Sequence, residues 1–516
     1  MSQCTQWHRW LAAALALAAP FHASAQQRYE VDPSFNGGHF FADRFAGSTS
    51  ANYQGRKLVV LANGDTVVAG RVSYGAQSDP AGWLHVGLVR YNASGQRVAW
   101  TGPGSSPYFH FNQHYVVYPK NDPSIPATRY RDVLDIAQYN GFLYVLVESD
   151  YAPPTRSVFV LVFRTDGTFV ESHTIYGALA PDPRAAALAV LPGFAFAPAR
   201  LLVIGTHTSP GTALRKIWMA RYGFTASGGL TAVPMPGANA NGHKDLPVPP
   251  FGQCNSVPTP FQCHMMATAI AHALPFGDIY IGGSIQPFQN STDWDYIVTR
   301  VDIDGNPRGD FGIGGQATVP INLNSFGAPD FLADLVARPV SGPGGFTVDA
   351  ELFLVGNAPI SLEANAETRI AIAKLGPAGA LDTAFGTGGR LVIPRCTDWA
   401  LDTCRATAAI LERNRLVIAG FGYGSANGNP GILLDIGLRT GAVANNTSCH
   451  YGSSGCGGTI FGHAYLRDIA VLPDGRLVAA GELTQADAGA TQMFGTVAFR
   501  VRDVIFEHDF DSRGDD

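Results

Sequence analysis

Charged residues are scarce in this 516-residue sequence and make up 15% of it, against roughly 25% in an average soluble protein. The 35 Lys and Arg residues are outnumbered by 41 Asp and Glu residues, which gives a formal net charge of −6. Clusters of basic residues are absent as well. Proteins that bind nucleic acid or anionic membranes rely on such positive patches. We therefore expect neither of these partners.

The sequence shows no apolar run of the roughly 20 residues that a transmembrane helix needs. An apolar segment at residues 11–20 is too short, follows Arg9 and precedes the small residues Ala23 and Ala25. This pattern is typical of a secretory signal peptide. We predict that residues 1–25 are a signal peptide cleaved near Ala25. The mature protein would then be secreted, periplasmic or held at the cell surface, with no transmembrane segment.

Cysteine is rare, with seven residues in the chain, six of which follow the predicted cleavage site. They lack the C-x2-C spacing that is typical of zinc sites. Exported proteins fold in an oxidising compartment, where disulfides form. We predict local disulfides over metal coordination, and we expect no metal and no cofactor. The six cysteines form three neighbouring pairs: Cys254 with Cys263, Cys396 with Cys404, and Cys449 with Cys456.

Glycine and proline, by contrast, are abundant, at 59 and 34 residues, and helical periodicity is missing between them. A short apolar strand that ends on glycine recurs along the chain, as in residues 278–283 and 476–481. A seventh copy, residues 142–147, ends on Val147 instead. The other copies end on Gly70, Gly205, Gly356 and Gly420.

Each copy has an apolar strand and a turn before it, a third strand after it, and in several cases a fourth Asp/Phe/Gly-Gly element. Four short strands per repeat are typical of a propeller blade. We predict an all-β, seven-bladed β-propeller of four-stranded antiparallel blades that occupies residues 26–503 as one domain, followed by an acidic tail at 504–516. The repeats lie around residues 57–91, 133–164, 187–222, 268–301, 333–375, 407–439 and 468–501.

The motifs of residues 298–315, 370–389 and 469–481 resemble the delta-60 repeat, a bacterial β-propeller repeat of exported proteins. The resemblance covers most of residues 30–503 and implies a propeller fold. It supplies no catalytic residues to carry over.

The order of the elements predicts how the ring closes. Residues 31–38 match the closing element of a repeat but stand before the first one, and the last repeat has no such element of its own. We expect residues 30–41 to pair with the last blade, at residues 468–502. Closure of this kind removes exposed sheet edges.

The third strand of each repeat ends on a basic residue. These residues could form a positive ring for an anionic ligand, or each could form a local ion pair. We favour local pairs, because like charges in a ring repel one another. The set consists of Arg90, Arg164, Arg221, Arg300, Lys374, Arg439 and Arg500.

Catalytic motifs are missing: the sequence has neither a Gly-x-Ser-x-Gly elbow nor a His-Glu-x-x-His helix. Two tryptophans stand out as candidates for ligand binding, Trp294 between Asp293 and Asp295, and Trp399 inside the Cys396–Cys404 loop. Three acids near the starts of first strands could line a channel mouth or bind a cation, or could cap turns and pair with basic neighbours. These acids are Asp135, Asp334 and Asp468.

These features favour a rigid exported platform that binds a glycan, a cell-surface component or a protein partner. The alternative is a secreted hydrolase or lyase with its active site at the mouth of the central channel, since a fold alone does not decide function. Acids and histidines that converge near the axis would favour catalysis, and an aromatic groove would favour binding.

We predict that the protein purified from an oxidising compartment carries disulfides in all three neighbouring cysteine pairs. Each bridge closes a short loop and stabilises the fold by at most about 2–3 kcal/mol. Titration of thiols in the denatured, unreduced protein measures this directly. Free thiols on all six cysteines would reject the prediction.

Overall fold

A computed structural model describes residues 29–501 apart from several segments. These are residues 39–40, 44–52, 74–83, 103–109, 113, 119–128, 151–155, 177–181, 194–196, 210–213, 240–241, 248–262, 274–277, 287–291, 324–326, 342–346, 364–365, 394–402, 424–429, 450–462 and 486–490. The predicted signal peptide and acidic tail lie outside the described residues.

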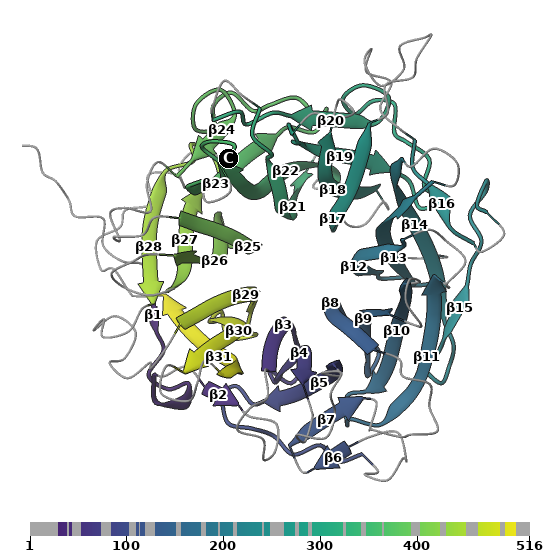
Figure 1. The fold of residues 1–516 in the computed structure, drawn as a ribbon, viewed down its shortest axis with the longest axis vertical. Coiled ribbons are helices and arrows are strands. Elements are labelled where there is room, and N and C mark those ends of the chain that lie inside the picture. Colours follow the sequence, from purple (N-terminus) through teal and green to yellow (C-terminus); the bar gives the residue numbers. More distant parts are fainter. Residues whose placement is uncertain are drawn as a thin grey trace, which may run out of the picture.

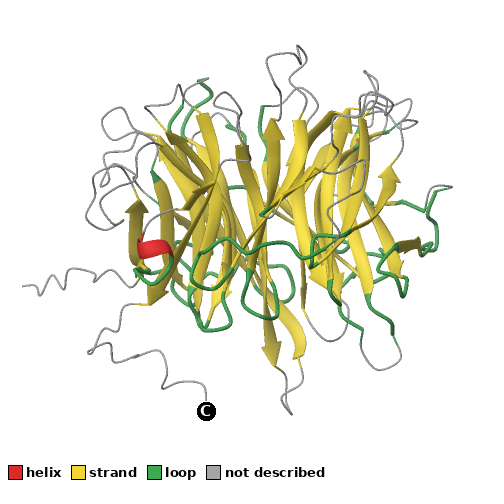
Figure 2. Cartoon of the chain, turned by 90° about the horizontal axis from the view of Figure 1, so that it is seen from below, coloured by secondary structure: helices red, strands yellow, loops and turns green. Residues whose placement is uncertain are grey.

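The described residues form seven antiparallel blades around a central axis, so the predicted seven-bladed propeller is confirmed (Figure 1). The strands run along the height of the ring (Figure 2). Within the described ranges the only helix is the short 3-10 turn η1 (Asn36–Gly38). No helix among these residues has the length and apolar character needed to span a membrane.

The first three blades follow one another along the chain, each with its first strand at the axis. Blade 1 contains β3 (Tyr53–Val60), β4 (Thr66–Ser73), β5 (Leu84–Tyr91), β7 (Tyr115–Tyr118) and β6 (His110–Asn112). Blade 2 contains β8 (Arg129–Tyr139), β9 (Phe142–Asp150), β10 (Arg156–Arg164) and β11 (Phe169–Tyr176). Blade 3 contains β12 (Arg184–Leu191), β13 (Arg200–Thr208), β14 (Arg215–Phe224), β15 (Leu230–Ala232) and β16 (Lys244–Asp245).

The remaining four blades complete the ring. Blade 4 contains β17 (His264–Ala273), β18 (Asp278–Gln286), β19 (Asp295–Val301) and β20 (Gln316–Val319). Blade 5 contains β21 (Phe331–Ser341), β22 (Thr347–Pro359), β23 (Thr368–Leu375) and β24 (Arg390–Val392). Blade 6 contains β25 (Thr403–Glu412), β26 (Arg415–Tyr423), β27 (Gly431–Gly437) and β28 (Val443–Cys449). Blade 7 contains β29 (His463–Val471), β30 (Leu477–Gln485), β31 (Thr491–Val501), and the N-terminal strands β1 (Tyr29–Val31) and β2 (Phe41–Asp43).

The N-terminal segment closes the ring as predicted. In the β1–β31 pair, Glu30 lies opposite Arg500. The strand β2 also pairs with β31, at residues 494–496. Asp32 Oδ2 accepts a charge-assisted hydrogen bond of 2.6 Å from Arg476. Phe35 is buried among residues of blades 7 and 1 and lies against Gly95, in a hairpin turn of blade 1. The seam between the chain ends is therefore packed like the interior of a blade.

The recurring glycine has a local cause. A β-bulge in the first strand of a blade directs a backbone carbonyl at the glycine of the second strand. A Cβ on Gly481 would lie 1.8 Å from the Tyr465 oxygen, and one on Gly283 would lie 1.9 Å from the Met266 oxygen. Blade 2 has Val147 in place of the glycine. Its first strand, β8, has a second register shift, between Tyr130 and Asp132, in addition to the one between Val133 and Asp135.

The residue after this glycine connects neighbouring blades. In blade 3, Thr206 Oγ1 accepts the N–H of Ala267 of blade 4 at 2.9 Å. In blade 4, Ser284 Oγ accepts the N–H of Leu332 of blade 5 at 3.1 Å. Blade 2 uses Glu148 in the same way, which accepts the N–H of Ala185 at 3.0 Å. These side chains satisfy N–H groups at the sheet edge, which would otherwise be unpaired.

Four of the seven basic residues occupy equivalent register positions, namely Arg90, Arg221, Arg300 and Lys374. Arg164 and Arg500 lie two residues further along their strands, and Arg439 lies beyond the end of β27. The predicted equivalence of all seven is therefore wrong. In blade 6, the shared position is occupied by an acid, Asp435, and its basic partner Arg415 lies on the second strand, 2.5 Å away.

Arg300 illustrates the local pairing that we favoured. Its guanidinium lies 2.6 Å from Asp278 of its own blade and 3.3 Å from Asp349 of the next one. The group therefore contributes to packing between blades, and the pairs do not form one open positive ring.

We predict that Phe35→Ala lowers the free energy of unfolding by about 3–5 kcal/mol, because it empties a buried site at the seam of the ring. Phe35 is 1% exposed. Ile313→Ala is the matched control, since Ile313 lies in the corresponding turn of blade 4 and is 57% exposed. Urea denaturation of both variants measures the difference. Equal stability of the two variants would contradict the docking of the N-terminal segment.

Candidate functional site

The first strands surround the channel and bring the three predicted acids to equivalent positions. Each acid directly follows the bulge of its strand, in blades 2, 5 and 7. Lys57 occupies this position in blade 1. Alanine occupies it in the other three blades, as Ala187, Ala269 and Ala408.

Asp135, Asp334 and Asp468 bind backbone N–H groups of the next blade. Their Oδ2 atoms accept hydrogen bonds from Leu188 at 2.9 Å, from Ala409 at 2.7 Å and from Leu58 at 2.8 Å, respectively. Each acid therefore connects two first strands.

Lys57 provides the positive charge for these acids. Its Nζ lies 3.9 Å from Asp468 Oδ1, and the two side chains are 29% and 16% exposed, towards the narrow channel. Burial raises the pKa of Asp135 and that of Asp334 to about 6, and the Lys57 charge opposes the increase. Asp468 thus has the basic neighbour that one interpretation expected, whereas the contacts of Asp135 and Asp334 are to backbone N–H groups. No cluster able to hold a metal ion occurs among the described residues.

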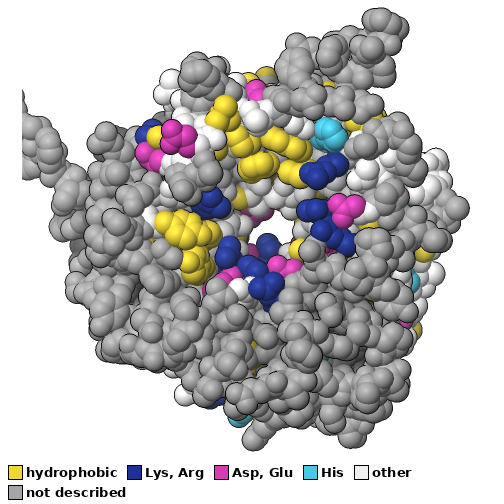
Figure 3. Space-filling model, viewed as in Figure 1, with side chains coloured by type: hydrophobic (Ala, Val, Ile, Leu, Met, Phe, Trp, Pro, Cys, Tyr) yellow, Lys and Arg dark blue, Asp and Glu magenta, His cyan; other side chains and the backbone are white. Residues whose placement is uncertain are grey.

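A second set of charges involves the first strands of blades 1, 2 and 7. Glu482 is buried and accepts hydrogen bonds from Arg56 at 3.0 Å and from Arg467 at 2.9 Å. Arg56 also lies 3.0 Å from Asp132. Figure 3 shows acidic and basic side chains gathered around the opening. These carboxylates already have basic partners, which does not favour a catalytic centre on the axis.

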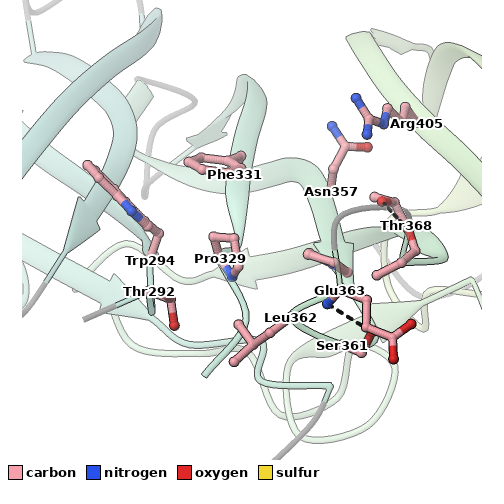
Figure 4. Close-up of a pocket in the computed structure, with 12 residues that line it drawn as sticks. Thr292, Trp294, Pro329, Phe331, Asn357, Ser361, Leu362, Glu363, Thr368 and Arg405 are labelled. Carbon is pink, nitrogen blue, oxygen red and sulfur yellow. Dashed lines mark hydrogen bonds between the residues drawn. The ribbon is translucent and has the colours of Figure 1, made fainter. Parts of the chain in front are cut away.

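Trp294 lines a pocket of about 620 Å³ between blades 4, 5 and 6 (Figure 4). The ring of Phe331 lies 5.9 Å from that of Trp294, centroid to centroid. The pocket has a mostly apolar wall and a few polar groups. Its lining residues are Thr292, Trp294, Pro329, Phe331, Asn357, Pro359, Ser361, Leu362, Glu363, Ala366, Thr368 and Arg405.

Backbone contacts hold the aromatic wall in place. The carbonyl of Trp294 accepts the N–H of Asp330 at 2.7 Å. The Asp330 carboxylate in turn accepts the N–H of Ile321 at 2.9 Å and that of Asn322 at 3.1 Å. The loop before β21 is therefore tied to the start of β19, and Trp294 is fixed next to Phe331.

The two acids beside Trp294 do not line the pocket. Asp295 is buried, and burial, together with the charges of Asp293 and Asp330, raises its pKa to about 7. Burial likewise raises the pKa of Asp330 to about 6 and increases that of Asp293. The structure thus gathers three carboxyl groups behind the aromatic wall.

Arg405 forms the opposite side of the pocket, at the start of β25. The side-chain amide of Asn357 binds both the N–H and the carbonyl of Ala406, at 2.8 and 3.1 Å, which fixes the backbone beside Arg405. Arg405 is exposed, and no ion pair is found for it within the described ranges. Sequence reasoning missed Arg405 and Phe331, because both precede the aligned part of their repeats.

Several predicted residues cannot be placed. Trp399, Cys254, Cys396 and Cys456 lie outside the described residues. Cys263 and Cys404 are buried, and Cys449 ends β28. The three disulfides therefore stay predictions.

No family model matches the chain, and no curated protein matches it. Solved structures resemble it at low identity. The polysaccharide lyase Uly1 has a TM-score of 0.45 and 11% identity over 93% of this chain and 98% of its own. An α-L-arabinanase of Penicillium chrysogenum complexed with arabinobiose has a TM-score of 0.38 and 14% identity over 70% and 91%. The Synechocystis apocarotenoid oxygenase has a TM-score of 0.40 and 10% identity over 91% and 92%. Likenesses this low say nothing of ligand or reaction, so function is argued from this chain's own residues.

We predict that Lys57→Met destabilises the protein more near pH 8 than near pH 5. The folded pKa values of Asp135 and Asp334 lie above the ordinary value of 3.8, so the folded chain binds more protons and its stability falls as pH rises through roughly 4 to 6. Without Lys57, the ionised acids have no counter-charge. The expected loss near pH 8 is about 3 kcal/mol, measured by urea denaturation.

Lys216→Met is the control for this experiment. Lys216 is also 29% exposed and lies 3.8 Å from one acid, Asp245. Its loss should cost under about 1 kcal/mol at either pH. An equal effect of Lys57→Met at both pH values would contradict the role assigned to Lys57.

Proposed function

We propose that this protein is an exported β-propeller that binds a glycan in the pocket between blades 4, 5 and 6. The observation that carries the proposal is the aromatic wall of Trp294 and Phe331 opposite Arg405. The signal-peptide pattern and the resemblance to the delta-60 repeat support export.

The pocket suits the chemistry of a sugar. A sugar ring presents apolar C–H groups on its faces and hydroxyl groups around its edge. The rings of Trp294 and Phe331 offer an apolar surface, and Phe331 is 39% exposed. Hydroxyl groups of Thr292, Ser361 and Thr368 lie among the lining residues. Such a mostly apolar pocket with a few polar groups is typical of small-ligand sites.

The arrangement favours binding over glycoside hydrolysis. Hydrolases of glycosides use two carboxyl groups on either side of the scissile bond. Among the lining residues that the structure describes, Glu363 is the only acid, and Asp293, Asp295 and Asp330 are not part of this lining. Outside the pocket, the buried Glu482 accepts hydrogen bonds from two arginines. A binding site therefore accounts for the described groups better than a hydrolase site with two carboxyl groups does.

We predict that Trp294→Ala weakens glycan binding by about tenfold or more, because it removes the larger aromatic surface of the pocket. The ligand is first found on a glycan array, and affinities are then measured by calorimetry. Val471→Ala is the control, since Val471 is exposed at the end of β29 and is not a lining residue.

Two results would count against this proposal. Unchanged affinity of Trp294→Ala would place the ligand elsewhere, and an array without any bound glycan would reject glycan binding. Release of new reducing ends from a bound glycan by the wild type would instead favour the hydrolase alternative.

A further inference from the structure

We propose that the ligand is an acidic polysaccharide, that Arg405 binds its carboxylate or sulfate groups, and that the chain extends from the pocket onto a second aromatic surface of blades 6 and 7. This second surface consists of Tyr423 and Tyr465, which pack on the buried ring of Phe421. The inference rests on the proposed function and names the class of glycan.

The pocket and the second surface share two strands. In the pairing of β25 with β26, Arg405 lies opposite Phe421, and Thr403 lies opposite Tyr423. Thr403 Oγ1 also accepts the N–H of Thr368, a lining residue of the pocket, at 3.3 Å. One pair of strands therefore carries the wall of the pocket and the beginning of the second surface.

The aromatic rings of the second surface pack against one another. The ring of Phe421 lies 4.8 Å from that of Tyr465 and 5.4 Å from that of Tyr423. Arg467 lies over the Phe421 ring, 4.9 Å from its centroid. The Tyr423 side chain is 38% exposed and thus open to a ligand.

The face of the ring seen in Figure 3 also has two separate hydrophobic areas. Hydrophobic side chains gather in two areas, one over blades 4 and 5 and one over blades 6 and 7, with basic side chains next to them around the opening (Figure 3). A single sugar would need only one of these areas. Two aromatic areas joined by β25 and β26 suit a chain of several sugars.

The state of Arg405 indicates the charge of the ligand. Arg56 and Arg467 are held by Glu482, whereas Arg405 is exposed in the pocket and has no ion pair among the residues that the structure describes. Glu363 lies across the pocket, next to Ser361 (Figure 4). A guanidinium group presents paired N–H donors that fit a carboxylate or a sulfate. A neutral sugar would offer this charge only hydroxyl groups and no opposite charge.

The test compares polymers that share a backbone and differ in charge. Polygalacturonate is compared with its methyl ester, and dextran sulfate with dextran, so that the two pairs distinguish carboxylate from sulfate recognition. Affinities are measured near 0.15 M salt, where weak long-range attraction is screened. We expect the wild type to bind at least one acidic polymer about tenfold more tightly than its neutral counterpart, as one additional charge-assisted contact would produce.

Arg405→Gln should abolish this preference, so that the acidic polymer binds no more tightly than its neutral counterpart. Arg338→Gln is the control, because Arg338 is a partly exposed arginine of β21 that faces Glu351 and does not line the pocket. If Arg405→Gln keeps the preference, or if the wild type binds both polymers of each pair equally, the inference about charge is wrong while glycan binding stands. If Trp294→Ala leaves binding intact, the proposed pocket itself is wrong.

The second surface is tested with oligosaccharides of increasing length. We expect affinity for the wild type to rise with length until both aromatic areas are covered. Tyr423→Ala should remove this rise and leave the affinity for the shortest oligosaccharide unchanged. The same length dependence in Tyr423→Ala and wild type would overturn the extension onto blades 6 and 7.

Discussion

The innermost strand of each blade is a sheet edge, and the ring depends on side chains of the preceding blade that accept its unpaired N–H groups. Aspartates after the bulge and polar residues after the glycine perform this task at most of the blade boundaries. Unpaired backbone groups at such edges are costly when buried. One contact of this kind also fixes a wall of the pocket, because the Asn357 amide that binds Ala406 holds the backbone beside Arg405.

The channel and the pocket differ in how their charges are satisfied. In the channel, Lys57 faces three aspartates and Glu482 is held by two arginines, so the described charges stabilise the ring. In the pocket, Arg405 has no ion pair among the described residues, and the Phe331 ring is 39% exposed. Groups that the fold does not use are the ones available to a ligand. For this reason we propose the ligand site in the pocket and not on the axis of the ring.

The sequence predicted the fold because each repeated feature has a local physical cause. The glycine recurs because a side chain would collide with a backbone carbonyl: in blade 7, a Cβ at this position would lie 1.8 Å from the carbonyl oxygen. The displaced closing element at residues 31–38 indicated which blade it completes. Of the pocket, only Trp294 could be predicted, from its place between two acids. Phe331 and Arg405 come from other blades and precede the aligned repeats, so nothing short of the ring geometry brings them together.

A crystal structure with a bound acidic oligosaccharide tests the central claim most directly. We predict a sugar ring packed against Trp294 and Phe331, with an acidic group of the ligand at the Arg405 guanidinium. A ligand bound inside the central channel, next to Lys57 and its aspartates, would contradict the account.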